Sequence, residues 1–283
     1  MTKERVIAAP LKENLPTPVV RDDSPKSHIL DRPLGIWGSR IIALIVLLIV
    51  WEWYASGVSR ALFATPSAIA EAFYQVTFVD NAMLVPMFQS LSTMVVGLIL
   101  VIIIAVPVGI LMGRSRVVEW ALDPYVTFLY VLPSISFIPL LVVWLGFGYN
   151  LRIVLVIISG VFPMIINTVA GVHNVDKELL DSGRSFTATE SQLIRTIVLP
   201  ASIPFIFAGL RIAFASAWVG VIVAEMTATL TGVGGMILIF AHRFQTANMF
   251  VPILFIMFIG VTIQGVFNAL QKRLTPWQQP APD

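Results

Sequence analysis

The chain has 283 residues, of which 57% are hydrophobic and only 12% are charged, and its formal net charge is +2. A soluble globular domain carries about 25% charged residues, so about half of the usual charged surface is missing. This composition excludes an ordinary soluble protein and predicts a chain that lies in a lipid bilayer. So small a net charge also argues against nucleic acid as a partner.

Cysteine and histidine, on which many metal and catalytic sites depend, are scarce. The chain has no cysteine, which excludes disulfides, thiolate metal ligands and a cysteine nucleophile. Its three histidines, His28, His173 and His242, lie far apart in the sequence. We therefore expect neither a metal site nor a cofactor bound by this chain.

The two ends of the chain differ from its apolar middle. Residues 1–37 are polar, contain prolines and carry charges of both signs. They have no apolar core beside a small-residue cleavage site, as a signal peptide would. We expect a disordered cytoplasmic tail at 1–37, a transmembrane domain at 38–274 and a short cytoplasmic tail at 275–283.

Long apolar runs predict six membrane-spanning helices. A helix needs about 20 predominantly apolar residues to cross the hydrocarbon core of a bilayer. The runs lie at about 38–57, 90–113, 124–145, 151–172, 203–228 and 250–271. The predicted fold class is therefore an all-α membrane protein with six transmembrane helices.

Lysine and arginine predict the orientation of these spans. If the N-terminus is cytoplasmic, fourteen of these residues fall in cytoplasmic segments and three in the opposite segments, namely Arg60, Arg152 and Arg243. Positive charge accumulates on the cytoplasmic side of membrane proteins. We therefore expect a multi-pass protein with both termini in the cytoplasm.

Small residues and prolines recur inside the predicted spans. Ala105, Gly109 and Gly113 are spaced by four, a pattern that lets a second helix approach closely. Pro133 and Pro139 interrupt the third span and free backbone carbonyls that need other partners. For the small residues we favour close packing, whereas for the prolines a position along the solute path and simple packing both remain open.

The segment between the fourth and fifth spans, about 174–200, is too long for a simple connector. Apolar residues at helical spacing share one predicted side: Leu179, Leu180, Gly183 and Phe186. We expect one or two short amphipathic helices in the cytoplasm, with Pro200 and Pro204 marking re-entry into the membrane. Such a helix either docks in a groove of a partner protein or lies flat on lipid headgroups, and the four acidic residues in the stretch favour a protein.

This segment resembles the cytoplasmic coupling loop of ABC importer permeases, whose pattern is E-A-A, three residues, G, nine residues, then I-x-L-P. Asp181-Ser182-Gly183, Thr187 and Ile197-Val198-Leu199-Pro200 follow the same spacing. Thr187 replaces a glycine that can take a positive φ, which costs threonine about 1 kcal/mol or more. A reshaped turn is therefore one expectation here. The residues that the resemblance assigns to ATPase coupling are Asp181, Ser182, Gly183, Arg184, Phe186, Thr187, Leu199 and Pro200.

Over about residues 62–274 the chain is similar to the permease family for nitrate, bicarbonate, taurine and alkanesulfonates. The matching pieces include Thr65-Pro66-Ser67, Pro107-Val108-Gly109, Trp144-Leu145-Gly146-Phe147-Gly148, Ala224-Glu225-Met226 and Gly232-Val233-Gly234-Gly235. Thr93 departs from the pattern, since that family often carries arginine there. Similar permeases also carry aromatic carboxylates and pyrimidine precursors of thiamine, so the resemblance leaves the solute open.

The resemblance implies the type I ABC importer permease fold in a bacterial inner membrane. It implies a homodimer of permeases, two ABC ATPase subunits that bind ATP and Mg²⁺, and an extracytoplasmic solute-binding protein. The chain itself would be a transport subunit rather than an enzyme, and it contains no G-x-x-x-x-G-K-[ST] phosphate loop. The solute expected on this basis is small, polar and anionic.

Ionisable groups inside predicted spans are candidates for a solute path. Arg211, Trp218 and Glu225 are spaced by seven and share one stripe of the fifth span. They either form a packed seam with two interfacial charges or line a path in which Arg211 favours an anion. With Pro133 and Pro139, these three residues are the candidate translocation path. On the sixth span, Gln264 and Asn268 are expected to hydrogen-bond between helices.

Two other classes compete with the importer. A secondary transporter driven by an ion gradient would place carboxylates near the middle of the membrane and often shows inverted repeats. An intramembrane enzyme would need a nucleophile and a base on facing helices. The span carboxylates Glu52 and Glu225 lie near predicted helix ends, and Ser159 has no histidine near it in the spans, so both alternatives are weaker.

Overall fold

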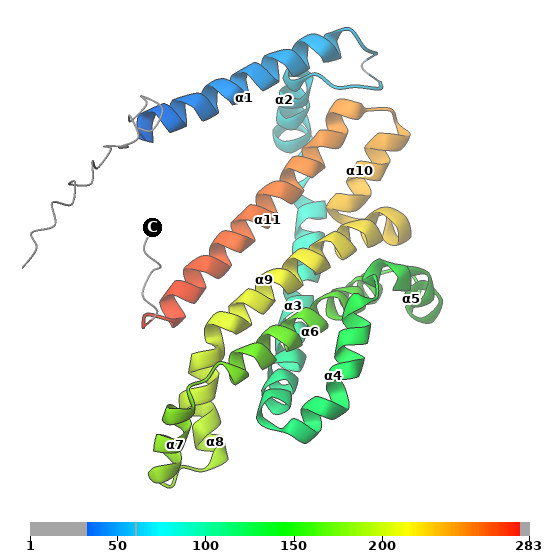
Figure 1. The fold of residues 1–283 in the computed structure, drawn as a ribbon. Helices are drawn as coiled ribbons and strands as arrows, with labels where there is room; N and C mark the ends of the chain where they lie inside the picture. Colours follow the sequence, from blue (N-terminus) through cyan, green and yellow to red (C-terminus); the bar gives the residue numbers. More distant parts are fainter. Residues whose placement is uncertain (1–32, 60, 278–283) are drawn as a thin grey trace, which may run out of the picture. The chain divides into compact units, whose positions relative to one another are not determined.

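A computed structural model describes residues 33–59 and 61–277 of the chain, and the regular secondary structure in these ranges is helical (Figure 1). The predicted N-terminal tail lies outside the described residues as far as residue 32, and so do residues 278–283 of the predicted C-terminal tail. Helix α1 (Pro33–Ser56) begins at a proline, which is well tolerated in the first turn of a helix. The helix therefore begins before residue 38, whereas the part of it that qualifies as a span begins at Gly38, as predicted.

The chain divides into two units between Val50 and Trp51, within α1. The described part of the first unit is the apolar helix that precedes this boundary. The candidate span of α1, Gly38–Ser56, includes residues on both sides of this boundary; it has 19 residues and a mean hydropathy of 1.6, which is long enough to cross a bilayer.

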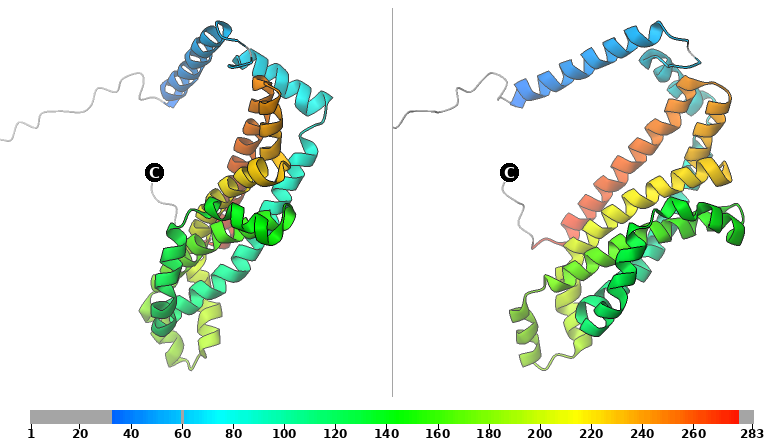
Figure 2. Two further views of the ribbon diagram at one scale, coloured as in Figure 1. Left: turned by 90° about the vertical axis from the view of Figure 1, so that its right-hand side faces the viewer. Right: turned by 45° about the vertical axis from the view of Figure 1, so that its right-hand side comes forward.

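The second unit contains the remaining helices in the described ranges. In chain order these are α2 (Pro66–Tyr74), η2 (Gln75–Val79), α3 (Leu84–Arg114), α4 (Arg116–Val131), η3 (Ser134–Phe137), α5 (Ile138–Leu145), α6 (Tyr149–His173), α7 (Lys177–Ser185), α8 (Glu190–Leu193), η4 (Ile194–Val198), α9 (Leu199–Ala224), η5 (Glu225–Thr229), α10 (Gly232–His242) and α11 (Thr246–Leu274). In Figure 2, α7 and α8 lie at the opposite end of the α6–α9 pair from α10.

Five helices in the described ranges are long and apolar enough to cross a membrane, and a bent pair makes a sixth if it counts as one span. That pair corresponds to the predicted third span. The sequence predicted one span at 124–145, interrupted by Pro133 and Pro139, and the chain bends by 87° between α4 and the helices η3 and α5. Leu132 takes an extended conformation (ψ 128°) because a residue before proline is disfavoured in the α-region, and Pro133 follows it.

The predicted fifth span also differs from the structure. A continuous helical run extends from Glu190 to Thr229, so the helix begins before Pro200 and Pro204, which remain the predicted point of re-entry into the membrane. Directly before Pro200, the π-helical turn η4 lets the N–H of Leu199 reach the carbonyl of Ile194. A wider turn at this point accommodates a residue that has no N–H to donate.

Helices α3, α6 and α9 form the centre of the second unit, and small residues set their spacing. A Cβ atom on Gly109 would lie 2.6 Å from the Cβ of Thr168, and one on Gly113 would lie 2.6 Å from the Cβ of Val172. Ala105 on the same stripe is fully buried. The small-residue stripe therefore serves close packing of α3 on α6, as the sequence predicted.

A second apolar cluster joins α2, η2, α10 and α11. Its buried members are Ala72, Val76, Met83, Val233, Phe240 and Val251. Helices α2 and α10 have only 9 and 11 residues, too few for a span, so the lengths of the apolar runs do not predict them. Helix α10 packs on both α3 and α11 and closes one end of the unit.

Candidate functional site

The predicted coupling segment contains two short helices, each with its own N-terminal cap. The side chain of Asp176 accepts a hydrogen bond of 2.9 Å from the N–H of Glu178 at the start of α7. At α8, Thr189 and Gln192 cap each other reciprocally through side chain and backbone. These caps satisfy N–H groups that short helices leave unpaired. The expectation of one or two short helices is met by α7 and α8.

The apolar side predicted for α7 is divided between the protein and solvent. Leu180 packs on a buried cluster that contains Val175 and Val198. A Cβ atom on Gly183 would lie 2.5 Å from the Cδ2 of Leu193, so only glycine permits this contact between α7 and α8 without rearrangement. By contrast, Leu179 is 54% exposed and Phe186 is 86% exposed. These two residues form an apolar surface on α7 that the described chain does not cover.

The turn after α7 keeps the conformation expected of a glycine. Thr187 has a φ of 58°, and its N–H donates to the carbonyl of Arg184 at 2.8 Å. The N–H of Ala188 then donates to the carbonyl of Gly183 at 3.1 Å. Both bonds satisfy carbonyls at the end of α7. The turn is therefore not reshaped, and Thr187 itself takes the left-handed conformation.

The other predicted coupling residues lie around these helices. Asp181 and Arg184 form an ion pair of 3.2 Å along α7. The backbone carbonyl of Ser182 accepts a hydrogen bond of 3.2 Å from the N–H of Phe186. Leu199 and Pro200 are half-buried at the start of α9. Leu199 packs against the buried cluster of Ile110, Val172, Val175 and Val198, so it does not belong to the exposed surface of α7.

Two residues of the predicted stripe on α9 lie beside α11. Trp218 borders an open groove of about 640 Å³ together with Phe214, Gln264 and Asn268. The indole Nε1 of Trp218 has no hydrogen-bond partner among the described residues. Arg211 donates to the side-chain oxygen of Asn268 at 3.3 Å and to that of Gln271 at 2.6 Å. The hydrogen bond predicted for Asn268 is therefore made to Arg211.

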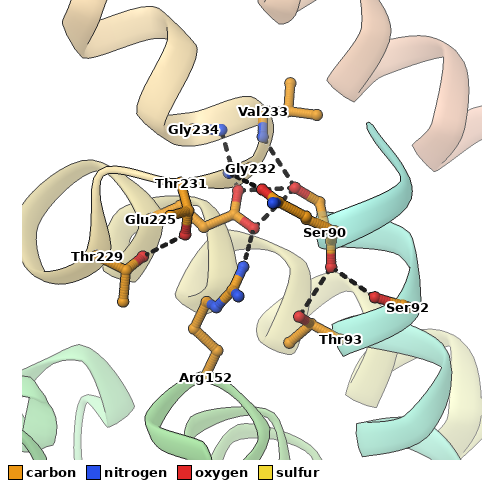
Figure 3. A network of polar contacts seen from close by, with 11 residues as sticks. Ser90, Ser92, Thr93, Arg152, Glu225, Thr229, Thr231, Gly232, Val233 and Gly234 are labelled. Carbon is orange, nitrogen blue, oxygen red and sulfur yellow. Dashed lines mark hydrogen bonds and ion pairs between the residues drawn. The ribbon is translucent and has the colours of Figure 1, made fainter. Parts of the chain in front are cut away.

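Glu225, the third residue of the stripe, does not line this groove. Figure 3 shows its carboxylate between α3, α6 and the start of α10, and its side chain is fully buried. The guanidinium of Arg152 donates to its Oε1 at 3.1 Å, and the N–H of Gly234 donates to its Oε2 at 3.0 Å. The hydroxyl of Ser90 lies 2.7 and 2.8 Å from its two oxygens.

Further bonds attach α10 to this network. The N–H of Val233 donates to the hydroxyl of Ser90 at 2.9 Å, and the N–H of Gly232 donates to the side-chain oxygen of Gln89 at 3.0 Å. These are N–H groups at the start of α10 that have no partner within the helix. We name Ser90, Arg152, Glu225 and the N–H groups of 232–234 the buried polar network. Through the carboxylate of Glu225, this network connects α3, α6, η5 and α10.

Sequence reasoning missed the pairing that holds this network. Arg152 was placed in a segment outside the membrane, but it lies in the first turn of α6 and is only 6% exposed. Glu225 is predicted near a membrane interface, and within the protein no part of it is exposed. Their opposite charges at the matching ends of two predicted spans were the available signal, because buried charges in membranes are normally paired.

The two prolines of the predicted path occupy different positions. Pro139 lies in the first turn of α5 and borders an apolar groove of about 480 Å³ with Ile135, Val142 and Phe147. Pro133 lies at the bend that precedes η3 and does not border this groove. The groove at α5 is also separate from the one that Trp218 borders.

Comparisons with known proteins agree on one family. Residues 105–279 match the family described as binding-protein-dependent transport system inner membrane component. A probable ABC transporter permease of Brucella abortus is 31% identical over 237 residues, covering 81% of this chain and 92% of the relative. The taurine transport system permease of Escherichia coli is 29% identical and covers 83% and 87% of the two chains. A nitrate import permease of Synechocystis is 26% identical and covers 84% and 89%.

The fold has a counterpart among solved structures. A methionine ABC transporter, solved in inward-facing conformations, superposes with a TM-score of 0.60 at 17% identity, over 66% of this chain and 94% of that chain. This likeness confirms the predicted fold class, and the family match rules out the secondary transporter and the intramembrane enzyme. The protein is a multi-pass inner membrane permease that performs no catalysis itself. The chain thus belongs to the binding-protein-dependent transport system inner membrane component family, the permease subunits of ABC importers.

Proposed function

We propose that this permease imports a small, polar, anionic solute and that helix α7 is the docking surface for the ATPase subunit. In this proposal the solute passes by alternating access, as separate ATPase subunits bind ATP and Mg²⁺ and close on each other. An extracytoplasmic binding protein delivers the solute. Two copies of this chain pair, and both termini face the cytoplasm.

The observation that carries the docking proposal is the exposed apolar surface of α7. Leu179 and Phe186 project from a helix that is capped at its start and packed on α8 through Gly183. Buried aromatic and aliphatic side chains supply most of the binding energy in protein interfaces. Asp181 and Arg184 place charges of both signs on the same helix, which favours a protein groove over a purely anionic lipid surface.

Two observations support the anionic solute. Relatives of this chain are named for the transport of taurine, aliphatic sulfonates and nitrate. Arg211 contributes a positive charge close to the groove on α9, where its partners Asn268 and Gln271 are neutral amides. A guanidinium without a paired carboxylate can still attract an anion. The proposed path therefore runs along α9 past Arg211 and Trp218, whereas a role of Pro133, Pro139 or Glu225 in it has less support.

Site-specific crosslinking tests the docking proposal directly. Because the chain has no native cysteine, Phe186→Cys introduces its only thiol. We expect this variant to crosslink to the ATPase subunit in membranes, and the matched variant Val143→Cys on the exposed side of α5 to form no such crosslink. Phe186→Ala should lower transport and solute-stimulated ATP hydrolysis about tenfold or more, because truncating such an anchor costs on the order of 2 kcal/mol.

Other outcomes would reject the proposal. Full transport by Phe186→Ala together with no crosslink at position 186 would show that α7 is an ordinary loop helix. A loss of transport that depends on anionic lipid, with ATPase association unchanged, would instead place α7 on the membrane surface. For the solute, an anion such as nitrate or an alkanesulfonate should raise the melting temperature of the partner binding protein, whereas an uncharged solute such as urea should not.

A further inference from the structure

An ion pair connects the coupling segment to α3, a helix to which it has no direct covalent link. The guanidinium of Arg114, the last residue of α3, contacts the carboxylate of Glu190, the first residue of α8. The other oxygen of Glu190 lies 3.6 Å from the guanidinium of Arg184 on α7. Charged contacts therefore run from α7 through Glu190 to α3.

The two arginines that contact Glu190 differ in burial. The Arg114 side chain is 18% exposed, whereas that of Arg184 is 52% exposed. Because Glu190 is 62% exposed in both contacts, the burial of the arginine decides how strongly water and salt screen each of them. Holding a partly buried side chain also costs less additional conformational freedom when the pair forms. Of the two contacts, the one to Arg114 is therefore the more effective constraint on Glu190.

Apolar packing beside this ion pair reinforces the connection. Ile110 of α3 lies in one buried cluster with Val172 of α6 and Val198 of η4. Leu180 and Ile194 from the coupling segment pack against that cluster. Gly113 holds α3 close to Val172, so the ends of α3 and α6 are in direct contact. A displacement of α8 is thus opposed by contacts on α3 as well as by its own chain connections.

We propose that Arg114 is a positioning residue that transmits the movement of the coupling segment to α3. This inference rests on the proposed docking of the ATPase at α7. The segment is joined covalently to α6 before it and to α9 after it, but it reaches α3 only through side chains. The Arg114–Glu190 pair makes α3 follow α8, so that three central helices rather than two move together. Neither residue occupies a fixed position of the coupling-loop pattern.

Charge reversal in the reconstituted transporter tests this role. The measured quantity is the amount of solute transported per ATP hydrolysed, in proteoliposomes that contain permease, ATPase subunit and binding protein. Arg114→Glu and Glu190→Arg should each lower this ratio about threefold, and the double variant Arg114→Glu/Glu190→Arg should restore most of it, because the pair is re-formed with its charges exchanged. Arg116→Glu is the matched control, since it reverses the charge of an exposed arginine two residues further along the chain and should leave the ratio close to that of the wild type.

Several results would overturn the inference. A double variant no better than the single variants would show that the two charges do not act as a pair. An equal loss in Arg116→Glu would show that positive charge beyond the end of α3, rather than the contact of Arg114 with Glu190, sets the ratio. If Arg114→Glu fails to accumulate in membranes, Glu190→Arg changes the exposed member of the pair and gives the same test. A crosslink at position 186 with a normal ratio in Glu190→Arg would reject only the role of Arg114, whereas the absence of that crosslink would reject the docking proposal itself.

Discussion

The charged groups at the two ends of the central helices are held in different environments. At the α10 end, Glu225 is fully buried and Arg152 is 6% exposed, and their 3.1 Å contact is surrounded by helix ends. At the α7 end, the carboxylate of Glu190 is 62% exposed, although it contacts two arginines. Removing a partner from a buried pair leaves an uncompensated charge, whereas an exposed charge regains water. The first arrangement fixes structure, and the second permits reversible contact with a partner.

The largest expected effect is the loss of the Glu225 carboxylate. Glu225→Ala leaves the Arg152 guanidinium buried without its ion pair and frees the N–H of Gly234. Breaking a buried ion pair costs about 3–5 kcal/mol. We therefore expect a fall of this size in the free energy of unfolding, measured by denaturant titration of the permease in mixed micelles. Glu178→Ala, at an exposed position on α7, is the control and should not change it.

A double substitution separates charge from packing at the same place. Arg152→Met/Glu225→Leu removes both charges while it keeps apolar volume, and such replacements are often neutral. We expect the double variant to lose less stability than Glu225→Ala alone. If Glu225→Ala is as stable as the control, the carboxylate does not organise the α10 end, and the contrast between the two ends is wrong.

A smaller effect is expected from a glycine beside the same carboxylate. Gly232 has a φ of 68°, and a Cβ atom there would lie 2.2 Å from the Oε1 of Glu225. Gly232→Ala should lower the free energy of unfolding by about 2 kcal/mol through backbone strain and displacement of the carboxylate. Gly265→Ala in α11 is the matched control, because no heavy atom lies within 4 Å of its added Cβ. Equal stability of the two variants would show that the buried polar network tolerates displacement.

These two ends also differ in how far the sequence predicts them. The coupling segment is local, so the positions of Gly183, Thr187 and Pro200 follow from spacing within a single stretch of chain. The buried polar network joins Ser90, Arg152 and Glu225, which are separated by 73 and 135 residues from one another in the hydrogen-bonded pairs. Such contacts depend on how helices pack, which hydropathy and periodicity do not specify.

The same reasoning explains the fold. Long apolar runs such as those of α3, α6 and α11 predict spans directly, since the bilayer sets their length. The bend after α4 depends on whether Pro133 kinks or interrupts its helix, and a proline in the sequence allows both. Helix α10 has a short apolar sequence, and its place is set by Glu225 and Ser90, which bind the N–H groups at its start.

The smallest expected effect is on the local stability of the turn between α7 and α8, where glycine substitutions at two neighbouring residues should have opposite effects. Thr187 takes a φ of 58°, whereas Ala188 is not among the described residues with positive φ. Thr187→Gly removes the strain of a left-handed threonine, about 1 kcal/mol, but it also gives the unfolded chain more conformational freedom, which costs slightly less than that. The net stability of the turn should therefore rise by up to about 0.5 kcal/mol. Ala188→Gly adds the entropy cost without relieving any strain, so it should destabilise the turn.

Hydrogen exchange of the α7–α8 amides measures both effects, because it reports local opening rather than global unfolding. We expect exchange about twofold slower in Thr187→Gly and faster in Ala188→Gly, with an unchanged global free energy of unfolding in both. Faster exchange in both variants would show that Thr187 carries no strain, and a change in global stability would show that the coupling end is as tightly joined to the core as the buried polar network.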